Sequence, residues 1–156
     1  LLDELKPPKG LPVHRMVFHE ITKPAILAAV EADRPVTLFG DDYPTPDGTN
    51  VRDYIHVADL ALAHVAAARR LDAGEPLERA YNLGSGDGVS VRQIMDAMAA
   101  ETGIAFDPEI GPRRPGDPPR IVASGELAAR DLDWRMRHSL AEMVRSAWEA
   151  RRASAL

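Results

Sequence analysis

Arg52 is a side chain whose type and position suit the binding of an anion. It stands near the start of an expected strand at residues 51–57, directly after a long loop at residues 41–50. A guanidinium can donate a pair of parallel N–H groups to a phosphate. An ion pair with Asp53 or with another acid of the loop is the alternative, and the spacing alone leaves both interpretations open.

A second candidate site lies in the sequence PRRPGDPP at residues 112–119, which contains Arg113, Arg114 and Asp117. Its prolines reduce the conformational entropy that the loop would lose on closing over a ligand. A guanidinium suits a pyrophosphate, and a carboxylate suits the paired hydroxyl groups of a ribose. The alternative is a solvated loop in which an arginine and the aspartate pair with each other.

The glycine-rich sequence GSGDG at residues 84–88 follows an expected strand and precedes an expected helix, where a phosphate can bind. Its spacing differs from G-x-G-x-x-G, because Val89 stands where the third glycine belongs. We therefore expect a structural turn here.

The histidines show no spacing typical of a metal site. They are His14, His19, His56, His64 and His138. No two of them form H-x-H or H-x-x-x-H, so no metal ligand is expected. For His56 we expect a structural hydrogen bond.

Short apolar segments and helix caps predict the elements that position these residues. Asp59 is the expected N-cap of one helix, and Ser90–Gln93 and Ser139–Glu142 are expected capping boxes. Gly103 is an expected helix stop. Strands are expected at residues 36–39, 51–57, 80–83 and within 104–110, and helices at 22–32, 60–71, 91–102, 127–132 and from Ser139 to about residue 152. This order predicts an α/β fold.

Composition sets broad limits on the function. A chain of 156 residues that is 45% hydrophobic is long enough for one ordinary domain. A net charge of −5 argues against a general nucleic-acid surface, and no apolar run is long enough to span a membrane. The absence of cysteine fits a cytoplasmic location. Because the chain begins at Leu1 and not at methionine, we expect a fragment or a processed product.

Several segments, in order, resemble UDP-glucose 4-epimerases, which are extended short-chain dehydrogenases/reductases of the NAD-dependent epimerase/dehydratase family. The matching segments are residues 41–64, 80–103, 112–119 and 123–152, and the resemblance extends over residues 36–152. It implies that residues 36–156 form the nucleotide-sugar-binding, C-terminal portion of such an enzyme. Residues 1–35, an irregular lead-in plus a helix, match the family weakly.

The resemblance also implies what this chain lacks. It would be the substrate-binding part of the fold, with short strands and about four or five helices, and without the N-terminal Rossmann half. Tyr43, Tyr54 and Tyr81 are not followed by a lysine four residues later, as the family's catalytic Tyr-x-x-x-Lys requires. No catalytic, cofactor-binding or metal-binding residue is therefore expected, and the chain alone is expected to be inactive.

The activity that the resemblance implies is that of an isomerase of galactose metabolism. It interconverts UDP-glucose and UDP-galactose through a 4-keto intermediate that requires NAD, a cofactor bound mainly by the absent half. The UDP-sugar would be the small-molecule partner, and the chain would form a homodimer in the full-length enzyme or associate with a missing N-terminal half. The alternatives are another nucleotide-sugar epimerase or dehydratase, acting on a pentose or uronic acid derivative, and a non-catalytic fragment that binds UDP-sugars weakly.

The resemblance assigns substrate contacts to seven residues: Thr37, Leu38, Phe39, Arg52, Arg114, Asp117 and Ile121. The first three match a strand whose backbone and aromatic side chain flank the uracil, although core packing is nearly as good an account of Phe39. The two arginines match phosphate-binding residues, and Asp117 matches an acid that binds the ribose. Ile121 matches a position that tunes the room for the sugar.

Without the missing half, four leucine and valine side chains are expected on an exposed apolar surface. They are Leu60, Val65, Leu71 and Leu83. Such a surface favours aggregation or self-association.

Overall fold

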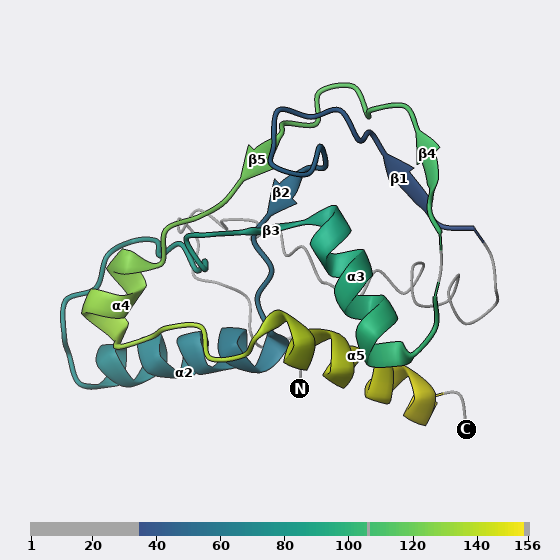
Figure 1. Ribbon diagram of the computed structural model, residues 1–156. Coiled ribbons are helices and arrows are strands. Elements are labelled where there is room, and N and C mark those ends of the chain that lie inside the picture. Colours follow the sequence, from purple (N-terminus) through teal and green to yellow (C-terminus); the bar gives the residue numbers. More distant parts are fainter. Residues whose placement is uncertain (1–34, 106, 155–156) are drawn as a thin grey trace, which may run out of the picture.

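The computed structural model describes residues 35–105 and 107–154, and it confirms an α/β fold with short strands and four helices in this part of the chain (Figure 1). The strands are β1 (Thr37–Phe39), β2 (Val51–Arg52), β3 (Val89–Ser90), β4 (Glu109–Gly111) and β5 (Arg120–Ile121). The helices are α2 (Val57–Asp72), α3 (Val91–Thr102), α4 (Glu126–Leu132) and α5 (Leu140–Ser154). The helix expected at residues 22–32 lies outside the described residues.

Two small sheets bring distant loops together. β1 runs parallel to β4 in a two-stranded sheet, with Leu38 opposite Ile110. The second sheet has the order β3-β2-β5, in which β2 is antiparallel to β3 and parallel to β5. Arg52 lies opposite Ile121 in this sheet. The β2–β5 pair therefore places the loop before Arg52 beside the loop that carries Asp117.

α3 packs across α5 and forms an apolar core with it (Figure 1). The buried side chains of this core are Ile94, Met98, Met143 and Val144. Met95, which neighbours Ile94 on α3, packs with Val36 and Leu38. These contacts join β1 to the helix pair.

The capping boxes expected at the starts of α3 and α5 are confirmed. Ser90 Oγ accepts the backbone N–H of Gln93, and Gln93 Oε1 accepts the backbone N–H of Ser90. Ser139 and Glu142 make the same reciprocal pair at α5. The backbone N–H of Ser139 donates to Glu142 Oε2 at 2.8 Å, and the backbone N–H of Glu142 donates to Ser139 Oγ at 3.3 Å. Gly103 ends α3 in the left-handed conformation, at φ 70°, as expected.

The two boxes allow a matched comparison of cap strength. Ser90 is buried and also donates a hydrogen bond to Asp47, whereas Ser139 is exposed. We expect Ser90→Ala to lower the free energy of unfolding by about 2 kcal/mol and Ser139→Ala by about 0.5–1 kcal/mol. Urea denaturation of the two variants tests this, and an equal loss would contradict it.

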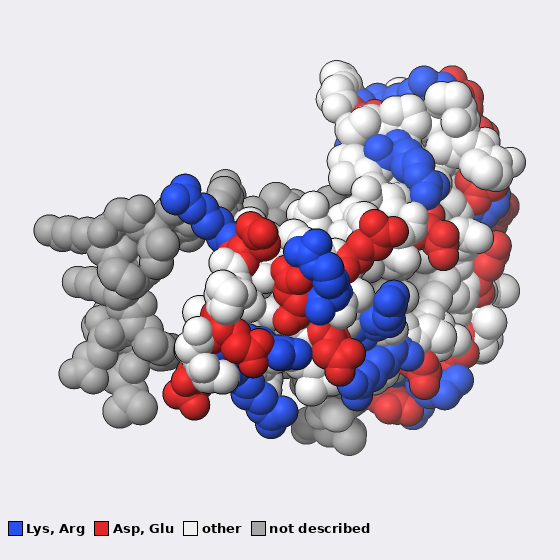
Figure 2. All heavy atoms as spheres, turned by 90° about the vertical axis from the view of Figure 1, so that its left-hand side faces the viewer, with Lys and Arg blue, Asp and Glu red and all other residues white. Residues whose placement is uncertain are grey.

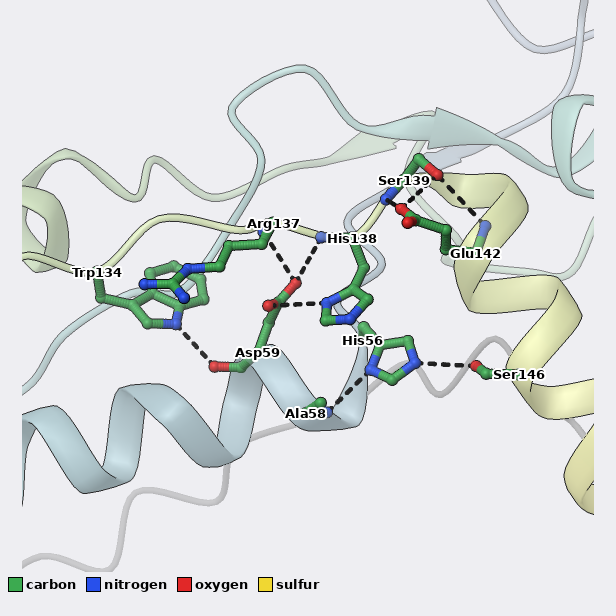
Figure 3. A network of polar contacts seen from close by, with 9 residues as sticks. All are labelled: His56, Ala58, Asp59, Trp134, Arg137, His138, Ser139, Glu142 and Ser146. Atoms are coloured by element: carbon green, nitrogen blue, oxygen red, sulfur yellow. Dashed lines mark hydrogen bonds and ion pairs between the residues drawn. The ribbon is translucent and has the colours of Figure 1, made fainter.

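The start of α2 differs from the prediction. The strand expected at residues 51–57 ends at Arg52, and the helix begins at Val57 with His56, not Asp59, as its N-cap. His56 Nδ1 accepts the backbone N–H of Ala58 at 3.0 Å (Figure 3). Asp59 lies inside the first turn because its carboxylate has partners elsewhere in the fold.

Two other expected strands differ from the structure. Residues 80–83 form no strand, and Tyr81 is held by its hydroxyl group, which donates to Asp131 at 3.1 Å and accepts the backbone N–H of Glu78 at 3.0 Å. The edge strand expected within residues 104–110 is confined to Glu109–Gly111. The expected helix at residues 127–132 is present as α4, and Ser124 near its start accepts the backbone N–H of Glu126.

The expected apolar surface is present only in part. Val65 and Leu71 are exposed, at 44% and 64% of their maximum. Leu60 and Leu83 are partly buried, and Leu83 packs against the cluster of Ala63, Ala128, Leu132 and Trp134 between α2 and α4. On the face in Figure 2, acidic and basic side chains are interspersed. None of the described helices is long and apolar enough to cross a membrane.

Candidate functional site

The loop before β2 is held in one shape by its own polar groups. Tyr43 N–H donates to the carbonyl of Gly48 at 2.8 Å, and Thr45 Oγ1 donates to the carbonyl of Thr49 at 2.6 Å. Gly48 has φ +78°, and a Cβ there would collide with the carbonyl oxygen of Asp41. Glycine is therefore required at this turn.

Asp47 ties this loop to the start of α3. Its carboxylate accepts the backbone N–H and the hydroxyl of Thr49, at 3.0 and 2.8 Å, and the hydroxyl of Ser90. Partial burial raises the pKa of Asp47, but the hydrogen bonds from Ser90 and Thr49, with the charge of Arg92, lower that pKa below its ordinary value of 3.8. The loop before β2 therefore has little conformational freedom.

Arg52 and Asp117 form an ion pair where the two loops meet. Arg52 is buried, with a side chain 7% exposed, and Nη2 donates to Asp117 Oδ1. Nη2 also donates to the carbonyl of Pro118 at 2.8 Å, and Nη1 donates to that of Val51 at 2.7 Å. Asn50 Nδ2 donates to the second oxygen, Asp117 Oδ2, at 2.7 Å. The Asp117 side chain stays 26% exposed, so a ligand can reach it.

The two arginines of the proline-rich loop lie on different aromatic rings. The Arg114 guanidinium carbon is 4.0 Å from the centre of the Phe39 ring, and that of Arg113 is 4.5 Å from the Tyr43 ring. Arg113 also pairs with Asp42, at 2.5 Å from Nε to Oδ1. Among the described residues, Arg114 has no ion pair. Its exposed charge therefore remains available to an anion.

β1 alternates between the core and the surface. Leu38 is 1% exposed and packs in the core, while Thr37 and Phe39 face outward. Phe39 is 37% exposed under Arg114, so it is not a plain core residue. Ile121 is 48% exposed in β5, beside Arg52 in register. The structure thus brings Arg52 and Asp117 together and stacks Arg114 on Phe39.

Comparisons with known proteins show which proteins this chain resembles. The model of the NAD dependent epimerase/dehydratase family matches residues 14–84. UDP-glucose 4-epimerase of Corynebacterium glutamicum is 47% identical over 127 residues, which are 80% of this chain and 38% of that protein. The chain is thus similar to members of the NAD dependent epimerase/dehydratase family. The Yersinia pestis UDP-glucose 4-epimerase is 43% identical over 141 residues, 90% of this chain and 40% of that protein.

A solved structure agrees with these matches. The crystal structure of UDP-glucose-4-epimerase from Stenotrophomonas maltophila, with bound NAD and formylated UDP-arabinopyranose, superposes with a TM-score of 0.78 and 40% identity. The superposition covers 96% of this chain and 43% of that one. The chain thus spans about two fifths of the length of the relatives it matches.

The glycine-rich segment at residues 84–88 forms a bend, as expected. Asp53 accepts the backbone N–H and the hydroxyl of Ser85, at 2.8 and 2.6 Å, and the backbone N–H of Ala123 at 2.7 Å. A Cβ at Gly84 would collide with the carbonyl oxygen of Ala123. The segment is therefore closed by its own contacts, and Asp53 is engaged here and not with Arg52.

The start of α3, which follows this bend, also does not fit the pyrophosphate of a dinucleotide. Val91 N–H donates to the carbonyl of Asn50 at 3.1 Å, and Arg92 N–H donates to Thr49 Oγ1 at 3.2 Å. The first free N–H groups of a helix are what bind such an anion, and here they have internal partners. The bend and the start of α3 therefore do not form a pyrophosphate site of this kind.

A polar network around His56 is the largest feature that the sequence did not show (Figure 3). Nε2 of His56 lies 2.9 Å from Ser146 Oγ, which confirms its structural role, and its ring stacks on His138 with centroids 4.1 Å apart. His138 Nδ1 lies 2.9 Å from Asp59 Oδ1, and Trp134 Nε1–H donates to the Asp59 carbonyl at 2.7 Å. This network joins α2 to α5.

Sequence reasoning also missed Asn50 and Asp47 as parts of the site. One signal was available for Asn50, because residues two apart in a strand lie on the same face, and Arg52 is two residues later. No local signal indicates that Asp47 would bind Ser90, which is distant in the sequence.

Proposed function

We propose that residues 36–156 form the UDP-sugar-binding portion of a UDP-glucose 4-epimerase. The observation that supports this most is the pairing of buried Arg52 with Asp117, close to the exposed and stacked Arg114. This arrangement offers two cations for a diphosphate and one carboxylate for hydroxyl groups within a short stretch of surface. The high identity to UDP-glucose 4-epimerases supports UDP-sugars as the ligand class.

Arg52 and Arg114 would bind the pyrophosphate. Three contacts engage Nη1 and Nη2 of Arg52, and within the described residues its Nε–H has no partner. A phosphate oxygen can therefore be bound without breaking every existing contact. Arg114 would supply the second charge from the loop, with Phe39 limiting its movement.

The uridine would lie along the surface between β1 and Asp117. The Asp117 carboxylate would accept hydrogen bonds from the ribose hydroxyl groups. The uracil would be flanked by backbone groups of Thr37, Leu38 and Phe39 and by the Phe39 ring. Ile121 would border the sugar. The hexose would thus be held mainly through its nucleotide, which leaves it free to turn.

The whole enzyme would be a cytoplasmic isomerase of galactose metabolism that uses NAD. Because the glycine-rich bend and the start of α3 do not fit the pyrophosphate of NAD, the cofactor would be bound by a part of the enzyme outside this chain, either in a homodimer of longer chains or in a separate partner chain. This chain alone would then be inactive. Mixing it with NAD and UDP-galactose tests this, and formation of UDP-glucose would contradict it.

A non-catalytic UDP-sugar-binding chain is the second candidate. The observation that favours it is that Tyr43, Tyr54 and Tyr81 all lack a lysine four residues later. An epimerase of another nucleotide sugar is a third, since the Stenotrophomonas protein holds a UDP-pentose. Competition among UDP-glucose, UDP-xylose and UDP-glucuronic acid for the chain would distinguish these ligands.

Arg114→Ala provides a direct test of the phosphate site. We expect it to weaken binding of UDP by about 10-fold, because a charge-assisted hydrogen bond at an exposed site is lost. Arg113→Ala is the matched control, since Arg113 is in the same loop but pairs with Asp42. Its effect should stay below about 2-fold. Isothermal titration calorimetry measures both, and equal affinities for the two variants would contradict the role of Arg114.

A further inference from the structure

Asn50 holds the acid that would bind the ribose. It is 8% exposed and directly precedes β2. Two hydrogen bonds fix its backbone. The Asn50 carbonyl accepts the N–H of Val91 at 3.1 Å, and the N–H of the next residue, Val51, donates to the carbonyl of Pro119 at 2.8 Å. Its side-chain amide is therefore aimed at Asp117 Oδ2 by a rigid strand start, at a distance of 2.7 Å.

Asp117 has few other restraints. It lies in a proline-rich loop next to Gly116, which has φ +77°, and its backbone N–H donates to the carbonyl of Arg114 at 3.2 Å. Its two carboxylate oxygens are held by different donors, Oδ1 by Arg52 and Oδ2 by Asn50. The orientation of the carboxylate thus depends on these two side chains.

The two donors respond differently to a bound diphosphate. A phosphate at Arg52 competes with Asp117 for the guanidinium, and the like charges of phosphate and carboxylate repel each other. Asn50 is neutral and its amide nitrogen only donates, so it keeps its hydrogen bond to the carboxylate when the phosphate arrives. A cationic residue in its place would attract the phosphate instead.

From this we propose that Asn50 is a positioning residue, which keeps the Asp117 carboxylate directed at the ribose while Arg52 is shared with the diphosphate. The inference rests on the proposed function, because it requires that Asp117 contacts ribose hydroxyl groups. It adds a residue that acts through Asp117 and need not touch the ligand.

The test compares UDP with 2′,3′-dideoxy-UDP, which lacks the ribose hydroxyl groups. For the unaltered chain we expect UDP to bind about 10-fold more tightly than the dideoxy analogue. In Asn50→Ala this ratio should fall to about 2-fold, while binding of the dideoxy analogue itself changes little. Because both ligands are measured on the same variant, a general loss of folded protein cancels in the ratio.

Asn82→Ala is the matched control, since Asn82 is exposed and lies in an irregular segment, and it should keep the 10-fold ratio. A ratio in Asn50→Ala equal to that of the unaltered chain would overturn the role of Asn50 and leave the proposed function intact. Failure of the unaltered chain to bind UDP at all would overturn the proposed function, and the inference with it.

A second measurement needs no variant. In a proton–nitrogen NMR spectrum of the unaltered chain, UDP should shift the Asn50 side-chain amide signals, because the ribose hydroxyl groups would donate hydrogen bonds to the same Asp117 carboxylate. The dideoxy analogue should shift them much less. Equal shifts with both ligands would overturn the proposal even if Asn50→Ala did not fold.

Discussion

Asp59→Ala should lower the free energy of unfolding by about 3 kcal/mol, which corresponds to a fall in melting temperature of roughly 6–12 °C. Asp59 is fully buried, and its Oδ2 accepts the backbone N–H groups of Arg137 and His138 at 3.0 Å each (Figure 3). Removing the carboxylate leaves these donors and the ring of His138 without their acceptor.

The control for this change is Asp72→Ala at the other end of α2. Asp72 is an exposed aspartate of the same helix, so its replacement should change stability by less than about 0.5 kcal/mol. Urea denaturation followed by circular dichroism measures both variants. A loss of stability in Asp59→Ala no larger than in Asp72→Ala would show that the network is not structurally important.

The effect of Asp59 should also depend on pH. Burial raises the pKa of Asp59, but the backbone N–H groups of His138 and Arg137 and the side chain of His138 lower that pKa below its ordinary value of 3.8. A pKa that is lower in the folded state stabilises the fold above the unfolded pKa, and this stabilisation is lost as the pH falls through the folded pKa. The stability difference between the unaltered chain and Asp59→Asn should therefore shrink between pH 5 and pH 2, and a constant difference would contradict it.

Elements defined by local signals were predictable from the sequence. β1, the capping boxes of α3 and α5, and the stop at Gly103 depend on residues only a few positions apart. The start of α2 was not predictable, because Asp59 is withdrawn from capping by partners 78 and 79 residues later in the chain. His56 then becomes the N-cap, although histidine is not one of the residue types that are typical of this position.

The candidate site was also predictable only where local signals define it. The loop sequence singled out Arg52, Arg114 and Asp117 because charge and proline content are local properties. Their pairing was left open, since an arginine can be neutralised by any nearby acid, and Asp53 was as close in sequence as any. The parallel pairing of β2 with β5 decides it, because it brings Asp117 to Arg52 while Asp53 turns to Ser85 and Ala123.

Arg52→Met should weaken UDP binding by about 100-fold, or roughly 3 kcal/mol. Methionine fills much of the same volume, but it removes the charge that would face the phosphate and the donor that orients Asp117. Arg120→Met is the matched control, because Arg120 lies in the neighbouring strand and is exposed, and its one hydrogen-bond partner among the described residues is the carbonyl of Asp87. Its effect on UDP affinity should stay below about 3-fold.

The two interpretations of Arg52 differ in what Arg52→Met would do to binding and to stability. A purely structural arginine would lower stability in Arg52→Met and leave the UDP affinity of the folded molecules unchanged. A phosphate-binding arginine would lower both. Arg52→Lys separates them further, because lysine keeps the charge but cannot offer the paired N–H groups. We expect Arg52→Lys to bind UDP about 10-fold less tightly than the unaltered chain, and unaltered binding in both variants would exclude Arg52 from the ligand site.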